Sequence, residues 1–291
     1  IDGSLACAAA GDEGRPRTRR PSRWGDRKVI GMVVGNPPDV VELERACLTA
    51  VPAQRVAFDG PFVVRSFLGG TGRANAASSL SAEPDPDLEA RIARIEAAYE
   101  RFGLPVRFRS SPLDPPGFAA ALSARGYTKK DETIIFLAPI DRIAQGDTAV
   151  RVLAAPDEDW MTVTATAEHQ VPARRAEKER AVGMMMAPAA WLVLQEAGRP
   201  LACISVVADG PSAGFFDLAV VPAARRQGLA SRITRAAADW ARAQGATWLW
   251  AQVASANHAS CAAQMSLGMR EAYRYVYFIR PPDKQPARRF G

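Results

Sequence analysis

Hydrophobic positions recur with helical spacing in one long segment of each half of the chain. In the first half, the apolar residues lie three or four positions apart, which places them on one face of a helix: Leu88, Ile92, Ile95, Tyr99 and Phe102. Residues 229–244 repeat this pattern, with arginines on the opposite face. Gly103 and Gly245 follow the two segments and suit helix C-terminal caps. The pattern therefore predicts one long amphipathic helix in each half.

Shorter segments around these two helices alternate between helical and extended patterns. Further helices are expected at residues 39–51, 118–124, 157–168, 173–185 and 258–267. Strands are expected within 55–68 and at 106–109, 133–137, 150–153, 190–195, 201–207, 215–221, 247–253 and 272–279. Residues 69–81 are typical of a loop and residues 138–148 of a linker. The chain is therefore expected to belong to the α+β (mixed α/β) class.

The two halves resemble each other in the order of their elements. Each long helix is followed by a strand, a second helix, a glycine (Gly126 or Gly268) and a last strand. We interpret this order as a weak internal duplication. The alternative is chance similarity between helices rich in alanine and arginine.

Composition narrows the class of protein. The chain has 291 residues, of which 48% are hydrophobic, so it can form a substantial core. No stretch reaches the roughly 18 to 20 apolar residues of a membrane-spanning helix, and no signal peptide is evident, so we expect a cytoplasmic location and no membrane partner. The four cysteines and two histidines are widely separated, which predicts buried, reduced thiols and no metal site.

The net charge of +6 lies at the two ends of the chain. Residues 1–31 hold seven basic and four acidic side chains, and residues 279–291 hold four and one. Charge confined to ends without hydrophobic periodicity is typical of solvated tails and argues against a nucleic-acid partner. The sequence begins with Ile, so Met32 is a candidate natural start.

The segment with the clearest chemistry joins a strand to the second amphipathic helix. The apolar strand 215–221 ends at Pro222, and Arg225-Arg226-Gln227-Gly228-Leu229-Ala230 leads directly into the helix. Amides at a helix N-terminus bind phosphate, and a glycine lets the backbone approach it closely. An Arg-x-x-Gly-x-Ala match alone is a weak signal, but its place between a buried strand and an amphipathic helix strengthens it.

Residues 150–280 resemble the GNAT acetyltransferases over essentially their whole domain. The resemblance rests on three motifs in order: the Val220-Val221-Pro222 strand end, the Arg225–Ala230 loop, and the segment from Asn257 to Leu267-Gly268. It implies a GNAT acyl-CoA N-acyltransferase fold, in which helices flank a central mixed sheet. The N-terminal half also resembles GNAT material, but Gly70–Asn75, roughly where a phosphate loop is expected, is separated from its helix by about ten residues.

The resemblance to tandem GNAT proteins with one degenerate half implies a domain organisation. Residues 32–140 are expected to form a degenerate N-terminal domain and 148–280 the catalytic domain. Residues 1–31 are interpreted as a disordered leader or a segment foreign to the natural chain, and 281–291 as a basic tail. In the degenerate half, Arg65, Arg73 and Asn75 either face the acceptor cleft or belong to a solvated loop.

The resemblance also implies acetyl-CoA as co-substrate, without a metal. Family members pair the strand before the loop with pantetheine, which here implies Leu218, Ala219 and Val220. Their loop amides hold the pyrophosphate, which implies Arg226, Gln227, Gly228, Leu229, Ala230 and Ser231, with Arg225 adding charge. Asn257 would contact the pantetheine arm. The reaction expected is direct transfer of an acetyl group, in a ternary complex, to a primary amine of a small molecule or peptide.

Catalysis needs a base for the amine, and Asp217 is the first candidate. An acid within an apolar strand is costly unless it is paired or used, so a hydrogen-bonded structural role is the alternative. Strand alternation places Asp217 on the face opposite Phe216 and Leu218. Glu168 and His169 are the next candidates, because they lie on an early helix that forms acceptor clefts in the family.

The general acid has no clear candidate. Many family members have a Tyr seven residues after the Asn, whereas this chain has Gln264, which leaves Ser260, Tyr273 or water. This departure suggests an alternative function, a non-catalytic acyl-CoA-binding or sensor protein. The basic tails alone suggest a third, a nucleic-acid-associated factor. The sequence specifies neither the acceptor nor an oligomeric state.

Overall fold

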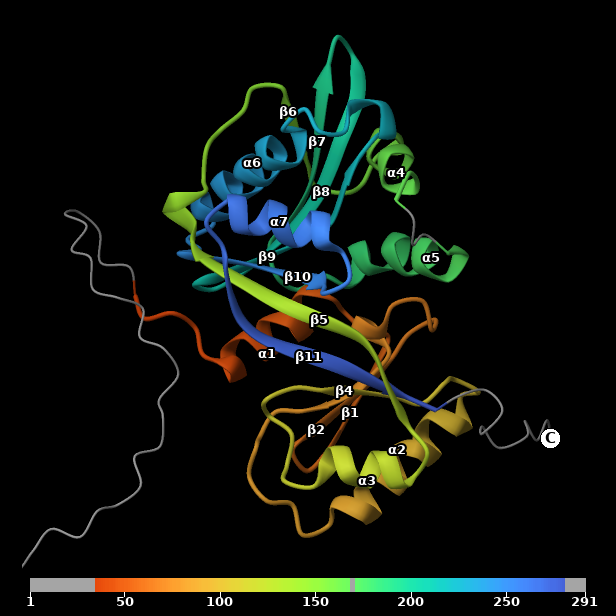
Figure 1. Ribbon diagram of the computed structural model, residues 1–291. Helices are drawn as coiled ribbons and strands as arrows, with labels where there is room; N and C mark the ends of the chain where they lie inside the picture. The colour runs from red at the N-terminus through yellow and green to blue at the C-terminus, as the bar shows by residue number, and fades with distance from the viewer. Residues whose placement is uncertain (1–34, 168–170, 281–291) are drawn as a thin grey trace, which may run out of the picture. The chain divides into compact units, whose positions relative to one another are not determined.

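The computed structural model describes residues 35–167 and 171–280, which belong to one compact unit. In this part of the chain, eleven strands form one mixed sheet and helices cover both of its faces (Figure 1). The expected mixed α/β class is confirmed. The domain boundaries remain a prediction, and residues 1–31 and 281–291 lie outside the described residues.

The first half contributes three α-helices and five strands. In chain order they are α1 (Val40–Ala50), β1 (Arg55–Asp59), β2 (Phe62–Ser66), the 3-10 turn η1 (Gly72–Ala74), β3 (Ala77–Ser79), α2 (Leu88–Arg101), β4 (Arg107–Ser110), α3 (Phe118–Ala124), β5 (Thr128–Pro139) and the turn η2 (Ile140–Arg142). The expected amphipathic helix is present as α2, with Ile92, Ile95 and Tyr99 buried, while Phe102 follows the helix and is half exposed.

The second half repeats the pattern with longer strands. Its elements are β6 (Val150–Leu153), α4 (Glu158–Ala165), α5 (Pro172–Ala181), η3 (Val182–Met184), β7 (Ala189–Glu196), β8 (Arg199–Asp209), β9 (Ser212–Val220), η4 (Pro222–Ala224), α6 (Leu229–Ala243), β10 (Trp248–Ala254), α7 (His258–Ser266) and β11 (Arg270–Ile279). The order α2-β4-α3-β5 recurs as α6-β10-α7-β11, as expected.

The halves share the sheet by exchanging their last strands. The strand order is β1-β2-β3-β4-β11-β5-β10-β9-β8-β7-β6, so β5 pairs with β10 and β11 pairs with β4. Strands β5 and β11 run antiparallel to each other along the middle of the sheet (Figure 1). Each half therefore completes its sheet with a strand of the other half.

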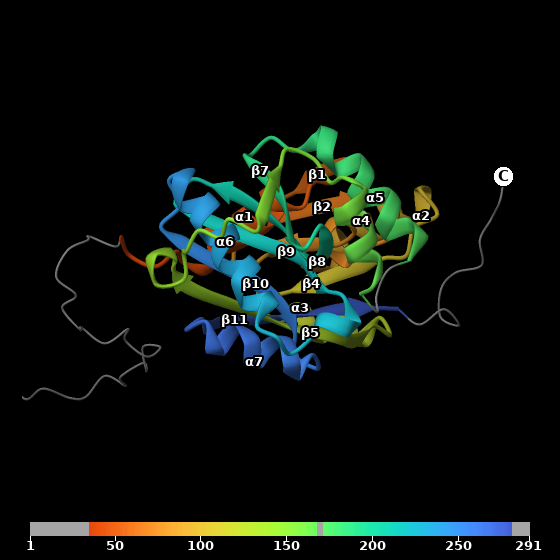
Figure 2. The same ribbon diagram turned by 90° about the horizontal axis from the view of Figure 1, so that it is seen from above.

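Separate hydrophobic clusters cover the two faces of the sheet. One contains Ile204, Phe215, Leu229 and Ile233 and packs α6 on the sheet. Another contains Leu43, Cys47, Val207 and Trp250 and packs α1 on the opposite face, since residues that alternate along a strand point to opposite faces. Figure 2 shows α7 and α5 on opposite sides of the sheet.

Two expectations for the middle of the chain were wrong. The expected loop 69–81 contains the strand β3, whose small residues are buried because β2 and β4 pair with it on both sides. The expected linker at 138–148 begins inside β5, and Ile140 and Ile143 are buried. Strand β5 also begins earlier than expected, because its polar start at residues 128–132 pairs with β11.

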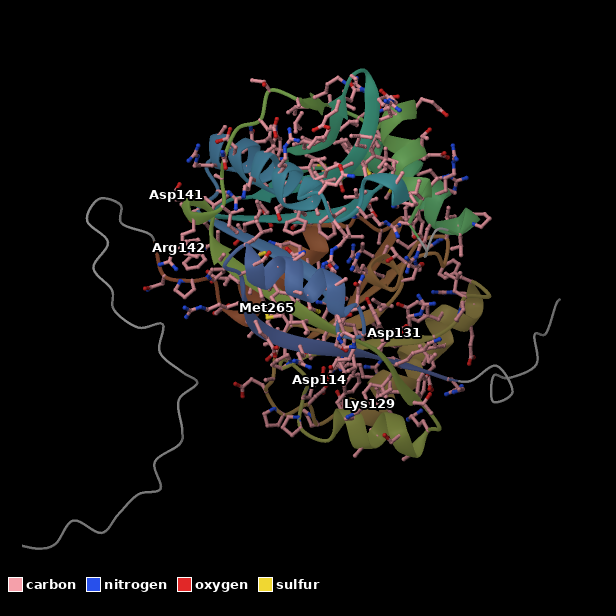
Figure 3. All side chains as sticks on the ribbon, turned by 45° about the horizontal axis from the view of Figure 1, so that its top comes forward. Asp114, Lys129, Asp131, Asp141, Arg142 and Met265 are labelled. Carbon is pink, nitrogen blue, oxygen red and sulfur yellow. The ribbon has the colours of Figure 1, made fainter. Side chains whose placement is uncertain are left out.

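A bulge bends β5 at Asp131, which is labelled in Figure 3. The register with β11 shifts between the pairs Tyr275–Thr133 and Tyr277–Lys130, and Asp131 has φ +55°. Aspartate tolerates this left-handed conformation better than most residues. The same device recurs in β9, where it shapes the candidate site.

Among the described residues, no helix is both long and apolar enough to cross a membrane. The three cysteines in this part of the chain, Cys47, Cys203 and Cys261, are free and buried, as expected.

Candidate active site

Strand β9 carries a bulge at the residue expected to act as base. The register with β8 shifts between the pairs Ser205–Phe216 and Cys203–Ala219, so two residues of β9 face Ile204 alone. Asp217 adopts φ +54° at this point. The indole Nε1 of Trp160 donates to the Ile204 carbonyl at 3.0 Å, which satisfies that carbonyl beside the bulge.

The bulge corrects the expected direction of Asp217. Simple alternation predicted that Asp217 and Phe216 point to opposite faces of the sheet, but both line the same cavity. The extra residue in the bulge interrupts the period of two, so neighbouring side chains reach the same side.

From the bulge onward, β9 is no longer paired with its parallel neighbour β10. The two strands pair only over Ser212–Phe215 and Trp248–Ala251, although β9 continues to Val220 and β10 to Ala254. Their outer edges stay paired, β9 with β8 and β10 with β5. The inner edges therefore have backbone donors and acceptors that an extended ligand can pair with. Leu218, Ala219 and Val220 lie along this gap, where the sequence predicted the pantetheine site.

Helix α6 begins at the end of this gap. Its N-cap is Gly228 at φ +79°, which no side chain caps, and its helical bonding begins with the Arg232 amide donating to the Gly228 carbonyl. The amides of the first turn, including Leu229, Ala230 and Ser231, therefore have no carbonyl within the helix to pair with. A Cβ atom on Gly228 would meet nothing within 4 Å. This open space beside unpaired amides suits a phosphate group.

Some side chains of the loop bond to nearby backbone carbonyls, and others are exposed to solvent. Arg225 donates through Nε to the Val220 carbonyl at 3.2 Å, and Gln227 reaches the Ala223 carbonyl at 3.5 Å. Arg226 is exposed at φ +65°. Asn257 caps α7, because its side chain accepts the Ser260 amide at 3.0 Å. The predicted pyrophosphate loop is therefore held by local hydrogen bonds, and its cationic side chain at Arg226 stays accessible.

A cavity of about 120 Å³ lies on the face opposite α6. Its lining comes from both halves: the end of α1, the loop around η1, α5, Met185 after η3, and strands β7, β8 and β9. Phe216 and Asp217 form part of its wall, at the bulge where β9 begins to part from β10. Cavity and helix N-terminus thus lie on opposite faces of the sheet, and the gap between β9 and β10 lies between them.

Asp217 is paired at the cavity wall. Lys178 of α5 donates to its Oδ1 at 2.6 Å, and the two side chains are 17% and 27% exposed. The same ammonium lies 5.6 Å from the centre of the Trp160 ring. An ion pair at this position suits both a base and a structural role, so the base assignment stays a prediction.

The loop that leads into η1 is fixed against α5. Glu177 accepts the amides of Leu68, Gly70 and Thr71 and the side-chain amide of Asn75, at 2.8 to 3.1 Å. A Cβ on Gly70 would lie 2.7 Å from the Arg174 amide and from the Glu177 carboxylate, so this contact needs glycine. Of the three residues expected near the acceptor cleft, Arg73 alone lines the cavity.

The other two residues hold the loop in place. Asn75 is buried and bonds to Glu177 and to the Phe67 and Gly69 amides. Arg65 is also buried and donates to the carbonyls of Leu48, Val51 and Arg73, where it covers the end of α1.

The candidates for the general acid do not line the cavity, unlike Asp217. Gln264 is 1% exposed on α7, and its Oε1 has no hydrogen-bond partner among the described residues. The Tyr273 hydroxyl donates to Glu44, and burial raises the pKa of this phenol. Ser260 lies in the first turn of α7. Glu168 and His169, the other base candidates, lie outside the described residues.

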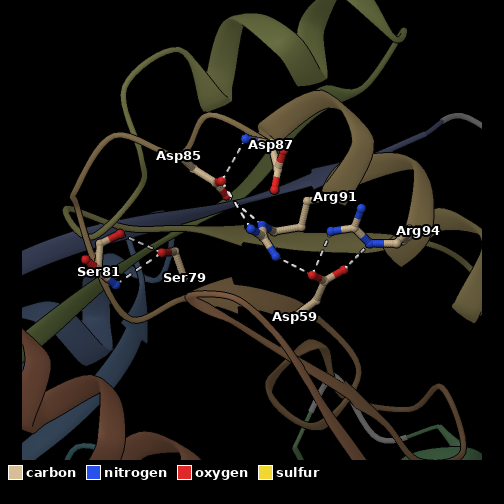
Figure 4. Close-up of polar contacts among 7 residues, drawn as sticks. All are labelled: Asp59, Ser79, Ser81, Asp85, Asp87, Arg91 and Arg94. Carbon is tan, nitrogen blue, oxygen red and sulfur yellow. Dashed lines mark hydrogen bonds and ion pairs between the residues drawn. The ribbon is translucent and has the colours of Figure 1, made fainter.

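The N-terminal half has a different structure at the equivalent place. β3 pairs in parallel with β4, and α2 follows β3 as α6 follows β9. The connecting segment is therefore 80–87, and the 70–75 segment that the sequence suggested lies before β3. Figure 4 shows that Asp85 accepts from Arg91 at 2.6 Å and from the Asp87 amide at 3.1 Å. The Arg91 hydrogen bond holds the pKa of the Asp85 carboxyl below its usual value.

Sequence reasoning missed the cavity residues Arg174, Glu177 and Lys178. They lie on α5, whose charged sequence is typical of a solvated surface helix. The sequence contained one signal of a polar site. Glu177 and Lys178 place an acidic and a basic side chain next to each other, one helical turn after Arg174. The partners of these residues, in the loop 68–75 and in β9, are too distant in sequence for periodicity to reveal.

The chain is an N-acetyltransferase of the GNAT superfamily, as its family match and its relatives show, and the parting strands and the glycine-capped helix fit this class. Residues 38–278 match the family described as "Probable histone acetyltransferase Rv0428c C-terminal". The chain belongs to this family.

Individual proteins resemble the chain over most of its length. It is 24% identical over 249 residues to the "Uncharacterized N-acetyltransferase YobR" of Bacillus subtilis, covering 83% of this chain and 99% of that protein. Its fold is similar to that of a GCN5-related N-acetyltransferase from Kribbella flavida, with a TM-score of 0.63 and 17% identity over 84% of this chain and 96% of the other. A tandem GNAT protein from the clavulanic acid biosynthesis pathway has a TM-score of 0.56 at 14% identity, covering 87% and 90%. The tandem GNAT architecture is therefore shared.

Proposed function

We propose that the chain transfers the acetyl group of acetyl-CoA directly to a primary amine that occupies the cavity. One observation carries the proposal: the gap between β9 and β10 lies between the open N-terminus of α6 and a cavity on the other face. A long ligand with a phosphate at one end and an acyl group at the other fits this arrangement. Acetyl-CoA would supply an activated thioester whose carbonyl carbon the amine attacks.

The residues that would hold acetyl-CoA are those along the gap and the loop. Backbone groups of Leu218 to Val220 would pair with pantetheine, and the amides from Arg226 to Ser231 would hold the pyrophosphate. Open space beside Gly228 supports this assignment, because a phosphate must approach the backbone there.

Cysteine chemistry supports direct transfer without an acyl-enzyme. Cys203 is buried beside the bulge, and burial raises the pKa of its thiol to about 12. Burial raises the pKa of Cys47 to about 12 as well. A thiol that stays protonated is a poor nucleophile, so neither residue suits a covalent acetyl intermediate.

Asp217 is our candidate for the base. It lies on the cavity wall, where a carboxylate can accept a proton from a bound amine, and it pairs there with Lys178. The amine would lose its proton toward Asp217 as its nitrogen bonds to the carbonyl carbon. The carbon–sulfur bond then breaks, and the CoA thiolate leaves and takes up a proton. The leaving group is acidic enough for water to supply that proton, which is compatible with Gln264 in place of a Tyr.

A combination of calorimetry and thiol release tests the proposal on the full chain. Calorimetry measures binding of CoA and acetyl-CoA, and release of free thiol is followed with a panel of primary amines, including small amines, amino acids, aminoglycosides and peptides. We expect micromolar binding and amine-dependent thiol release. Absence of CoA binding would refute the site. Binding with no transfer to any amine would instead favour the non-catalytic acyl-CoA-binding alternative.

A further inference from the structure

The walls of the cavity carry more positive than negative charge. Three cations, Arg73, Arg174 and Lys178, and two carboxylates, Glu177 and Asp217, line it. Both carboxylates are already used by the protein. Lys178 holds Asp217, and three backbone amides and the Asn75 side chain hold Glu177. Among the described residues, neither carboxylate forms an ion pair with Arg73.

Arg73 contacts both strands where they part. Its Nη2 donates to the Gln252 carbonyl of β10 at 3.4 Å, and its guanidinium carbon lies 5.9 Å from the centre of the Phe216 ring on β9. Among the described residues, no carboxylate oxygen lies within 4.0 Å of a nitrogen of this guanidinium. A guanidinium has five N–H donors, and a carboxylate accepts two of them side by side.

Two more arginines increase the positive charge behind Arg73. Arg65 and Arg109 share with it the lining of a second, small cavity of about 10 Å³, where the single carboxylate is Glu44. Arg109 already binds both oxygens of Glu44, at 2.6 and 3.0 Å. Burial, with Arg109 nearby, lowers the pKa of Arg65 to about 10. An excess of buried positive charge is costly, and an anion in the neighbouring cavity would offset it.

The volume of the cavity limits what that anion can be. If one water occupies about 10 to 15 Å³, a cavity of about 120 Å³ holds roughly eight to twelve waters. This space accommodates a small organic molecule. The anion and the reacting amine must both fit in it, with the amine at Asp217 and the anion at Arg73.

We infer that the acceptor is a small amino acid, whose carboxylate binds Arg73 while its amine faces Asp217. This inference rests on the proposed function and adds the chemical class of the acceptor. Arg73 then binds the negative charge that distinguishes an amino acid from a simple amine.

The test compares acceptors that differ only in the carboxylate. Glycine, β-alanine and several L-amino acids are each paired with the corresponding carboxamide, and kcat and KM are measured by thiol release on the full chain. We expect the acid to exceed its amide in kcat/KM by about 10- to 100-fold, the range for a charge-assisted hydrogen bond. Equal use of acid and amide would overturn the inference while leaving the acetyltransferase activity intact.

Arg73→Gln should remove this preference, and Arg73→Lys should keep part of it. We expect the glutamine variant to raise KM for the acids by about 10- to 100-fold and to leave the amides unchanged. Arg45→Gln is the matched control, because it removes the same charge from an exposed position on α1. A fall in kcat for acids and amides alike in Arg73→Gln would show that Arg73 acts on the acyl group, which overturns the inference.

A binding measurement covers the case without turnover. N-acetylglycine and its amide are added to the protein with CoA, and the melting temperature is recorded. We expect the acid, and not the amide, to raise the melting temperature of the wild type. No difference between them would overturn the inference even if Arg73→Gln fails to fold. A difference without any amine transfer would instead refute the proposed function and keep a carboxylate site.

Discussion

The two halves of the chain contain the same strand-to-helix connection, but the charged residues in the two connections have opposite signs. Eight residues, 80–87, join β3 to α2, and eight residues, 221–228, join β9 to α6. The first connection holds Glu83, Asp85 and Asp87, whereas the second holds Arg225 and Arg226 and ends in Gly228. Acids before a helix occupy its positive end, so α2 offers no place for a phosphate.

The strands that precede these connections differ as well. β3 has three residues, all buried, and two of them pair with β4, so no long unpaired edge remains. β9 has nine residues and leaves β10 after the first four. The duplicated fold therefore keeps its scaffold in both halves, while a long parting strand and a basic, glycine-capped helix start occur together in one half only. Four predictions test this contrast.

The largest effect on the rate is expected from replacing Asp217, the aspartate at the bulge of β9. Asp217→Asn should lower kcat by roughly 10²- to 10⁴-fold, the usual contribution of a positioned base, and leave CoA affinity almost unchanged. Asp131→Asn is the matched control, because Asp131 occupies the bulge of β5 at nearly the same φ but is exposed and far from the cavity lining. Kinetics and CoA calorimetry on both variants check this. If Asp217→Asn keeps its full rate, Asp217 is structural, and Glu168 or His169 becomes the better candidate.

Gly228→Val should weaken CoA binding by about 100-fold, because the side chain would fill the open space where a phosphate is expected. Valine at φ +79° is also strained, so a control for strain is needed. Gly117 provides it: it is the N-cap of α3 at φ +84°, and a Cβ there also meets nothing within 4 Å. Calorimetry should show normal CoA binding for Gly117→Val, with a similar loss of melting temperature in both variants. Equal CoA affinities would exclude the loop as the phosphate site.

The sequence predicts the features of this contrast that depend on local patterns, but not those that depend on contacts between distant residues. The loop, the strand before it and both long helices follow from local patterns, because periodicity and the order Arg-x-x-Gly-x-Ala lie within thirty residues. The parting of this strand from β10 does not follow from them. Neither does the bulge at Asp217, where Trp160, distant in sequence, donates to the Ile204 carbonyl. Nor does the exchange of β5 and β11, or the cavity wall that Glu177 assembles from α5 and the distant loop 68–75. These features need long-range contacts that one sequence does not specify.

A third prediction concerns a carboxylate of the N-terminal half that forms no ion pair with any described residue. Asp114, labelled in Figure 3, lies between β4 and α3, and burial raises the pKa of its carboxyl to about 6. The folded state therefore binds this proton more tightly than the unfolded state, so its contribution to stability is present below about pH 4 and is lost as the pH rises to 6. From pH 4 to 7 we expect a loss of about 2 kcal/mol, which Asp114→Asn should lack. Denaturant unfolding at both pH values measures it, and parallel pH curves would contradict the prediction.

The smallest effect is expected at Arg226, the exposed cation of the basic connection. Asn tolerates the φ of +65° at this position, so Arg226→Asn removes the charge with little backbone strain. We expect about a 5-fold loss of CoA affinity at low ionic strength, and a smaller loss in 0.5 M salt, because salt screens an exposed charge. Calorimetry at both salt concentrations separates the contribution of the Arg226 charge to CoA affinity from that of the backbone amides, which Gly228→Val blocks. A loss that is equal at low and high salt would mean that Arg226 shapes the loop and does not act by charge. In that case the acidic residues of the 80–87 connection would not by themselves explain the missing phosphate site of the N-terminal half, and the short β3 would become the main cause.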